Sequence, residues 1–218
     1  MASTSGTPDI TIFHVPGSRS TMVVWMCEEL ALPYKAVLVD SGKPRSPEHL
    51  AAHPLGLVPA FVDGGLIVQE TGAQIQYLLE RYSKGKLQYP PGDWERRGPF
   101  LQWCWRAEAM LLPVISEVVH HTKLLPEDKR IPQLVPYEES TVIPRLIIIN
   151  DQLSNKAYIA GEEFTAADVM IGYTLSVARN STDLLTKSDT DFKHIMRYLE
   201  RVLSRPAYRA ARGLAPEQ

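Results

Sequence analysis

The sequence predicts an α/β domain with the element order βαβαββα, followed by a domain made only of helices. Two observations carry this prediction. Short strand patterns alternate with helical patterns in the first third of the chain, and strand patterns nearly vanish after it. The segment Ser83–Asp93 between these parts is rich in Gly, Pro and Lys, which is typical of a linker. We predict domains over residues 9–83 and 94–218, joined by a linker over 84–93.

The first domain begins with a strand over Ile10–Val15 and a Pro-Gly-Ser turn at residues 16–18. Apolar residues at helical spacing then predict a helix over about 20–30. A second strand is expected over Tyr34–Val39. Ser46-Pro47 begins a short helix, because serine is a favoured N-cap and proline a favoured first helical residue.

The most informative stretch follows, over Gly56–Thr71. Val58-Pro59 starts one strand, and an Asp63-Gly64-Gly65 turn leads to a second, which is the pattern of a β-hairpin. Proline is tolerated at a strand start, and a cis bond there would leave the Val58 N–H and carbonyl free for an extended ligand. Glu70-Thr71 then begin a helix over about 71–82, whose first amides can hold a carboxylate. The stretch predicts a slot for a small peptide-like molecule with a carboxylate at one end.

The second part of the chain shows helical patterns only. One long helix is expected over Trp94–His121, with a kink at Pro113, and another over Val135–Asn155. Thr165-Ala166-Ala167-Asp168 is a capping box that begins the next helix, so Asp168 is interpreted as a structural cap. A last helix is expected over about 191–203.

Composition excludes several function classes. The net charge of −2 argues against nucleic acid as the main partner, because phosphate binding needs a basic excess. Two cysteines, Cys27 and Cys104, make neither a disulfide framework nor a metal site, and their apolar helical surroundings predict buried structural thiols. No apolar run approaches a membrane span, and the polar start MASTSGTPD lacks the apolar segment of a secretory signal. We expect a disordered N-terminal arm and a cytoplasmic protein.

The Val58-Pro59 and Glu70-Thr71 pairs, in this order of elements, resemble those of the cytosolic glutathione transferases over about Asp9–Arg209. The resemblance implies a thioredoxin-like N-terminal domain with a cis-proline before its third strand. It implies glutathione as co-substrate, with the Glu-Thr pair holding the γ-glutamyl end. It also implies a two-fold homodimer, with candidate contacts on the helix after Glu70 from Gln74, Tyr77 and Leu78.

These transferases lower the pKa of the glutathione thiol, which a hydroxyl donor and a helix N-terminus can do. The resemblance assigns the donor to the first strand-to-helix turn. Ser18 matches the serine after Pro-Gly, Ser20 is the alternative, and Ser18 could instead be only a turn or cap residue. Arg19 would be a cation beside the thiolate or a solvated loop charge. The sequence Ser18-Arg19-Ser20 resembles that of a large bacterial and fungal group of these transferases. The turn holds no tyrosine or cysteine, so tyrosine-type and cysteine-type mechanisms are not expected.

The second carboxylate of glutathione needs another partner in this chain. Leu57 stands where the family often has a lysine that contacts the glycine carboxylate. The resemblance therefore leaves His53, Lys43 or Arg45 as replacements within loop reach. His53 could equally be a polar cap at a helix end.

The electrophile is expected between the domains, against the long helix. The residues predicted to contact it are His14, Val15, Trp103, Arg106, Met110 and Leu111. Aromatic residues and methionine at helical spacing could instead be core, and Arg106 could be a surface charge paired with Glu108 or Glu95. A cation there could bind an acidic electrophile or stabilise developing negative charge.

The function predicted from the resemblance is a detoxifying glutathione S-transferase, which adds the glutathione thiolate to a small hydrophobic electrophile. One alternative is a glutathione-dependent isomerase, lyase or biosynthetic enzyme on the same fold. Another is a non-catalytic carrier or interaction module, because fold does not dictate function. A thioredoxin-like redox protein is excluded, since the chain has no Cys-x-x-Cys.

Overall fold

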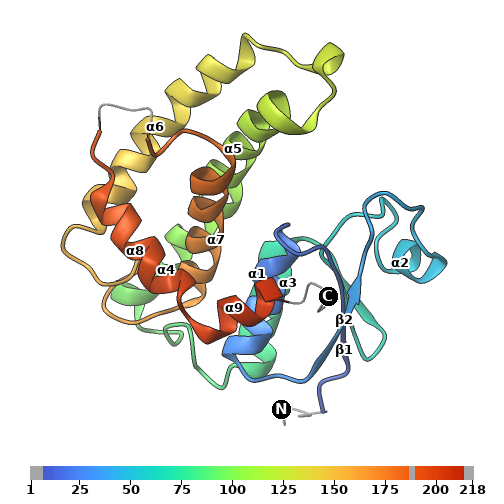
Figure 1. Cartoon of the computed structure of the whole chain (residues 1–218). Coiled ribbons are helices and arrows are strands. Elements are labelled where there is room, and N and C mark those ends of the chain that lie inside the picture. The colour runs from blue at the N-terminus through green and yellow to red at the C-terminus, as the bar shows by residue number, and fades with distance from the viewer. Residues whose placement is uncertain (1–6, 187–189, 214–218) are drawn as a thin grey trace. The chain divides into compact units, whose positions relative to one another are not determined.

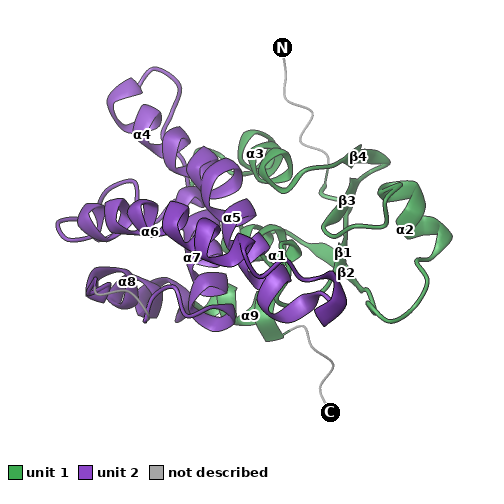
Figure 2. Ribbon diagram, turned by 90° about the horizontal axis from the view of Figure 1, so that it is seen from above, with its two compact units in different colours: residues 1–86, 205–218 green, residues 87–204 purple. Residues whose placement is uncertain are grey.

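The computed structural model describes residues 7–186 and 190–213. These residues belong to two compact units, one running up to residue 86 and including the residues from 205 on, the other spanning 87–204 (Figure 2). The predicted disordered arm lies, over residues 1–6, outside the described part. Among the helices described, none is long and apolar enough to cross a membrane.

The first unit contains a four-stranded sheet in the order β2-β1-β3-β4. The strands are β1 (Ile10–His14), β2 (Tyr34–Leu38), β3 (Ala60–Asp63) and β4 (Leu66–Val68). The helices between and after them are α1 (Ser20–Glu29), α2 (Pro47–Ala52) and α3 (Thr71–Tyr82). Helices α1 and α3 lie on one side of the sheet and α2 on the other (Figure 2). The predicted βαβαββα order is confirmed.

The strand register brings four loops to one edge of this sheet. β2 runs parallel to β1, whereas β3 pairs antiparallel with β1, Phe13 opposite Ala60. β4 pairs antiparallel with β3, Phe61 opposite Val68. The C-terminal ends of β1, β2 and β4 therefore lie beside the N-terminal end of β3. The Pro-Gly-Ser turn, the loop after β2, Val58-Pro59 and Glu70-Thr71 all leave the sheet at this edge.

Residues alternate along β1 between the two faces of the sheet. On the α2 side, Phe13 packs with Ala52 and Ala60, and its ring stacks on His49 with 4.7 Å between the centroids. Ile12 and His14 belong to the other row and are both fully buried. His14 is thus a polar member of an otherwise apolar face.

A short helix that sequence analysis did not predict, α9 (Pro206–Gly213), packs on α1 (Figure 1). Proline at its first position was an available start signal. Ala211 is the only fully buried residue among those described for α9, so no apolar stripe marks the helix in the sequence. Its contacts make it part of the first compact unit, whereas sequence analysis had counted all residues from 94 on with the helical domain.

Arg205, which precedes α9, forms a bidentate ion pair with Glu29 of α1, with N···O distances of 2.6 and 2.7 Å. The Glu29 side chain is 8% exposed and also accepts a hydrogen bond from Trp25 Nε1 at 2.9 Å. Arg205→Ala leaves this carboxylate without its cation, so we expect the free energy of unfolding to fall by about 2 kcal/mol. Urea unfolding followed by tryptophan fluorescence measures the change. The matched control is Arg209→Ala, an exposed arginine of α9; equal stability of the two variants would contradict the prediction.

The described residues of the second unit form helices and connecting loops and no named strand, as predicted. Its α-helices are α4 (Trp94–Trp105), α5 (Leu112–Val119), α6 (Leu134–Gln152), α7 (Ala166–Ser181) and α8 (Lys193–Leu203). Helix α7 is buried over most of its length and contacts α4, α5 and α8 (Figure 1). The predicted capping box of Thr165 and Asp168 begins α7.

The long helix predicted over 94–121 is continuous but not uniform. Two π-helical stretches, Arg106–Leu111 and His120–Leu124, interrupt its α-helical winding. The first ends just before Pro113, which lacks the N–H that an α-helical turn would use. In this wider turn the Met110 carbonyl accepts a hydrogen bond from Nη1 of Arg145, on α6, at 2.8 Å. π-helical turns are frequent at functional sites, which directs attention to this stretch.

Candidate active site

The turn between β1 and α1 brings two serine hydroxyls together. Gly17 adopts φ +87°, which glycine tolerates, and the Ser18 N–H donates to the Val15 carbonyl at 3.0 Å. The two Oγ atoms of Ser18 and Ser20 lie 2.8 Å apart. Ser20 is fully buried, whereas Ser18 is half-buried. Of the two predicted donors, Ser18 is therefore the one whose side chain reaches the surface of the unit.

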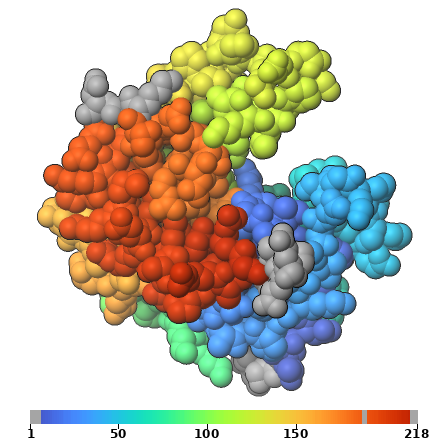
Figure 3. All heavy atoms as spheres, viewed as in Figure 1, coloured from blue at the N-terminus to red at the C-terminus, as the bar shows by residue number. Residues whose placement is uncertain are grey.

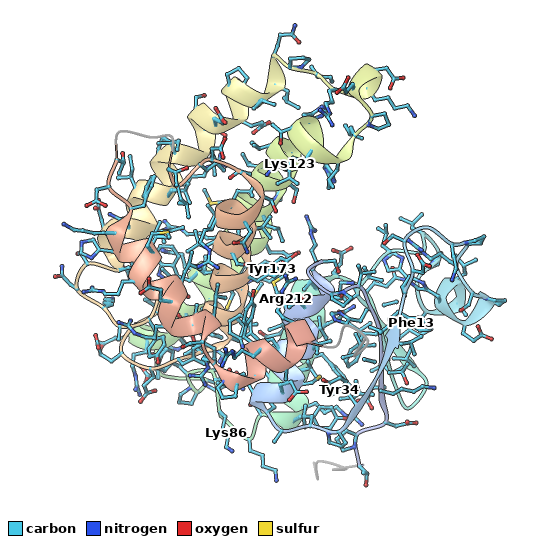
Figure 4. All side chains as sticks on the ribbon, viewed as in Figure 1. Phe13, Tyr34, Lys86, Lys123, Tyr173 and Arg212 are labelled. Carbon is cyan, nitrogen blue, oxygen red and sulfur yellow. The ribbon has the colours of Figure 1, made fainter. Side chains whose placement is uncertain are left out.

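Sequence analysis missed the role that His14 has behind this turn. Its side chain is fully buried, so it offers no surface to the electrophile for which it was predicted, whereas Val15 and Arg19 are half-buried. Burial lowers the pKa of His14 to about 4, the Ala211 backbone opposing this shift and the Arg212 guanidinium adding to it. The imidazole is therefore neutral at neutral pH. Arg212 comes from α9 and is labelled in Figure 4.

The Val58-Pro59 peptide bond is cis, as predicted. Side chains on both sides hold its loop. His49 Nε2 lies 2.9 Å from the Leu57 carbonyl, and the Gln74 amide donates to the carbonyls of Pro59 at 3.2 Å and Val68 at 2.8 Å. Within the described residues, neither the N–H nor the carbonyl of Val58 is hydrogen-bonded to protein. Both are available to an extended ligand, as an added strand would use them.

The buried position of Gln74 corrects the expectation that it contacts a second subunit. Gln74 and Leu78 are fully buried within the first unit. Tyr77 is half-buried and donates to the Asp63 carboxylate at 2.7 Å. The helical spacing of these residues marks the inner face of α3 and not an outer one.

Glu70 stands at the N-terminus of α3 with an uncommon backbone conformation, φ +68°. Its side chain is exposed, does not cap the helix, and forms no hydrogen bond with the described residues. Thr71 beside it is buried. A non-glycine residue at positive φ, whose carboxylate has no hydrogen-bond partner among the described residues, is typical of a binding site. The positive end of the 12-residue α3 adds a place for an anion.

Lys43 and Arg45 lie on the loop after β2 and contribute to a cavity of about 300 Å³. The segment around α2, which also lines it, stands out from the rest of the unit in Figure 3 (light blue). Lys43 Nζ is 3.2 Å from the exposed Asp40 carboxylate. Arg45 donates to the carbonyls of Gly56 at 3.0 Å and of Asp40 at 2.9 Å. Arg45 therefore holds two loops together, whereas Lys43 is the more exposed of the two cations.

His53 is the C-cap of α2, just before the cis-proline loop. Its N–H donates to the His49 carbonyl at 2.8 Å, which agrees with the structural alternative for this residue. Its side chain is 8% exposed, and Nδ1 is buried without a partner among the described residues. A buried ring nitrogen without a protein partner is also a candidate contact for a ligand, in addition to the role of His53 at the helix end.

Four residues predicted to contact the electrophile line one small cavity of about 50 Å³ in the helical unit: Trp103, Arg106, Met110 and Leu111. The Arg106 guanidinium lies over the Trp103 ring, 4.8 Å from its centroid. Sequence analysis missed the α6 wall of this cavity, Arg145, Ile148 and Ile149, because only contact between two helices brings it there. The cavity combines apolar walls with two arginines.

The two cysteines take no part in this site. Burial raises the pKa of the Cys27 and Cys104 thiols well above their usual range, so neither is a ready thiolate. Cys27 is fully buried in α1, as predicted, while Cys104 keeps partial exposure.

Family models match most of the chain. Residues 12–87 match the N-terminal domain of glutathione S-transferase, and residues 111–206 match its C-terminal domain. The chain is 32% identical over 215 residues to glutathione S-transferase 3 of Schizosaccharomyces pombe, covering 93% of this chain and 86% of the relative. The chain belongs to the glutathione S-transferase family. The predicted resemblance is therefore confirmed at the level of the family.

Solved structures support the fold of this glutathione S-transferase family member. A glutathione transferase from Phanerochaete chrysosporium, crystallised with oxidized glutathione, has a TM-score of 0.80 at 24% identity and covers 98% of this chain and 100% of its own. A theta class enzyme from Xanthomonas axonopodis pv. citri with glutathione bound has a TM-score of 0.80 at 21% identity, covering 95% and 99%. The predicted fold, a thioredoxin-like α/β domain plus a helical domain, is confirmed.

Proposed function

We propose that this protein is a glutathione transferase that binds glutathione at the loop edge of its sheet and activates the thiol through Ser18. One observation carries the proposal: the strand register brings Ser18, the cis Val58-Pro59 loop and Glu70-Thr71 to the same edge. Glutathione is peptide-like, with a thiol in the middle and a carboxylate at each end. It needs a donor for sulfur, a strand-like partner for its backbone, and an anion site at each end.

Each need has a candidate in the first unit. The free N–H and carbonyl of Val58 would pair with the cysteinyl backbone of glutathione. The exposed Glu70 carboxylate would bind the ammonium group of the γ-glutamyl end. Thr71 and the first amides of α3 would bind the carboxylate of that same end. Lys43, supported by Arg45 and His53, would bind the glycine carboxylate. It would replace the lysine that the family often has at the position of Leu57.

The chemistry proposed for Ser18 is of the serine type. The thiol proton leaves to solvent, and the Ser18 hydroxyl then donates a charge-assisted hydrogen bond to the thiolate. The N-terminus of α1, where Ser20 begins the helix, and the Arg19 guanidinium add positive potential nearby. The thiolate attacks an electrophilic carbon, forming a carbon–sulfur bond as the leaving group departs.

We propose a small hydrophobic electrophile, with Trp103, Arg106, Met110 and Leu111 among its contacts. Two arginines in an apolar cavity favour a substrate that carries negative charge or develops it during reaction. A detoxifying role, a cytoplasmic location and a homodimer complete the proposal. Light scattering on the purified protein tests the homodimer.

Calorimetric titration with glutathione tests the site. Glu70→Ala is expected to weaken binding at least about tenfold, because a lost charge-assisted hydrogen bond contributes about 1.5–3 kcal/mol. The matched control is Glu80→Ala, an exposed glutamate near the other end of α3, which should bind like the wild type. No binding by the wild type at millimolar glutathione would overturn the transferase and favour the carrier. Equal affinity of both variants would remove Glu70 from the site.

A further inference from the structure

The Ser20 hydroxyl has more neighbours than a surface serine would need. Its Oγ lies 2.7 Å from His14 Nδ1 and 2.8 Å from Ser18 Oγ. It also lies 3.1 Å from the Val15 nitrogen and 3.2 Å from the Val15 oxygen. Both Ser20 and His14 are fully buried, so no bulk water shares these bonds. A chain of three side chains thus runs from His14 in the interior to Ser18 at the rim.

Hydrogen-bond capacity limits how the protons of this chain are arranged. A hydroxyl donates once and accepts twice. The Val15 N–H always occupies one acceptor position on Ser20. If His14 Nδ1–H occupies the second, Ser20 cannot also accept from Ser18, so the 2.8 Å contact requires the Ser20 proton to go to Ser18 and not to the Val15 carbonyl at 3.2 Å. The Ser18 Oγ also accepts the Ser20 N–H at 3.3 Å. Ser18 then has both acceptor positions filled, and its own proton must point outward.

The opposite arrangement reverses every bond in the chain. With the proton on Nε2, the His14 Nδ1 accepts from Ser20, Ser20 accepts from Ser18, and the Ser18 proton points inward. Nε2 is buried, and no acceptor among the described residues meets hydrogen-bond geometry with it; the Ala211 backbone acts as an acceptor on the pKa of the ring, but from outside that geometry. A buried N–H without a well-aligned acceptor is costlier and rarer than an unused acceptor. The geometry therefore favours the proton on Nδ1 and the Ser18 proton outward.

We propose that His14 is a positioning residue that, through Ser20, turns the Ser18 hydroxyl proton toward the thiol of glutathione. The inference rests on the proposed function and extends it, because it explains why Ser18 acts as a donor. Bonds that run in one direction polarise one another, so the outward proton is a better donor to a thiolate. The hydroxyl also needs no reorientation when the thiolate forms, which is how preorganised donors contribute to catalysis.

The test measures the pKa of the bound glutathione thiol from thiolate ultraviolet absorbance in five variants, of which Ser18→Ala is the reference for the double variant. His14→Phe keeps a buried ring without a donor, and should raise this pKa by about one unit and slow conjugation about tenfold at a pH below it. His14→Asn can offer an N–H where Nδ1 was and should stay near the wild type. His14→Gln offers one near Nε2 and should behave like His14→Phe. In the double variant His14→Phe/Ser18→Ala, the pKa should equal that of Ser18→Ala alone.

A structural role for His14 would give other results. Additive effects in the double variant, or equal behaviour of the Asn and Gln variants, would overturn the proposal. If His14→Phe does not fold, long-range proton–nitrogen NMR of histidine-labelled wild type decides, with the His14 signal assigned by its loss in His14→Asn. A proton on Nδ1 is expected, and a proton on Nε2 overturns the inference. A wild type that fails to bind glutathione would reject the proposed function instead, so the two failures are distinguishable.

Discussion

Ser18→Ala is expected to raise the pKa of the bound glutathione thiol toward the ordinary value of about 8.5. A hydrogen bond to a charged group contributes about 1.5–3 kcal/mol, and one pKa unit corresponds to ~1.36 kcal/mol, so the expected rise is about one to two units. Conjugation of an activated aryl chloride below that pKa should slow by about 10–100-fold, in proportion to the lost thiolate. Affinity for glutathione should change little, because Ser18 would act on the ionised sulfur.

Three further variants make this result specific. Ser18→Thr keeps the hydroxyl and should retain most of the activity, while Ser41→Ala removes an exposed serine of another loop and should change nothing. Ser20→Ala should lower stability, because it leaves the half-buried Val15 N–H and the fully buried His14 Nδ1 without their hydroxyl partner. An unchanged thiol pKa in Ser18→Ala would reject the serine-type mechanism and move the role to Arg19 or to the first amides of α1.

Much of this site follows from local patterns in the sequence. The Val58-Pro59 pair, the glycine turn after Asp63 and the Glu70-Thr71 pair each have a local physical meaning. Their order specifies a hairpin followed by a helix, and the structure has both. The capping box at Thr165 is readable for the same reason, since all its partners lie within four residues.

Other features depend on contacts that no local pattern contains. Ser18 and Ser20 look equivalent in the sequence, and only the fold encloses one and leaves the other at the surface. His14 continues the strand and is predicted to contact the substrate, but strand alternation turns it inward, where it is fully buried. Arg145 of α6 reaches the Met110 carbonyl through a contact between two helices that are far apart in the sequence. Helix α9 packs on α1 with Ala211 as its one fully buried residue among those described, so periodicity could not reveal it.

Asp168→Ala should be the most destabilising of the substitutions considered, lowering the free energy of unfolding by about 3–5 kcal/mol. The carboxylate is fully buried and accepts hydrogen bonds from the N–H groups of Ile159 and Thr165, both at 2.8 Å, and from the Tyr198 hydroxyl at 3.0 Å. Alanine would leave these buried donors without acceptors at the start of α7, the central helix of its unit. Urea unfolding against the exposed control Asp128→Ala measures the loss.

The burial of Asp168 also predicts how the stability of the protein depends on pH. Burial raises the pKa of this carboxyl to about 6, while its hydrogen bonds from Ile159, Thr165 and Tyr198 oppose the shift. In the unfolded chain the value is about 3.9, so between these values the folded state binds the proton that the unfolded state releases. The stabilisation that comes from this proton uptake is therefore full below about pH 4 and is lost as the pH rises through about 6, whereas the hydrogen bonds of the cap remain.

Asp168→Asn isolates this contribution, because it keeps the side-chain shape but cannot titrate. An amide can accept from the Ile159 N–H and the Tyr198 hydroxyl, but it then turns its NH₂ group toward the Thr165 N–H. We expect Asp168→Asn to be less stable than the wild type and more stable than Asp168→Ala. Its deficit against the wild type should be larger near pH 4.5 than at neutral pH, since only the wild type gains from protonation in that window. A deficit that stays constant would show that Asp168 titrates at its ordinary value, and one that grows toward neutral pH would show that its hydrogen bonds lower its pKa. Either result would show that burial is not the dominant influence on the pKa of this cap.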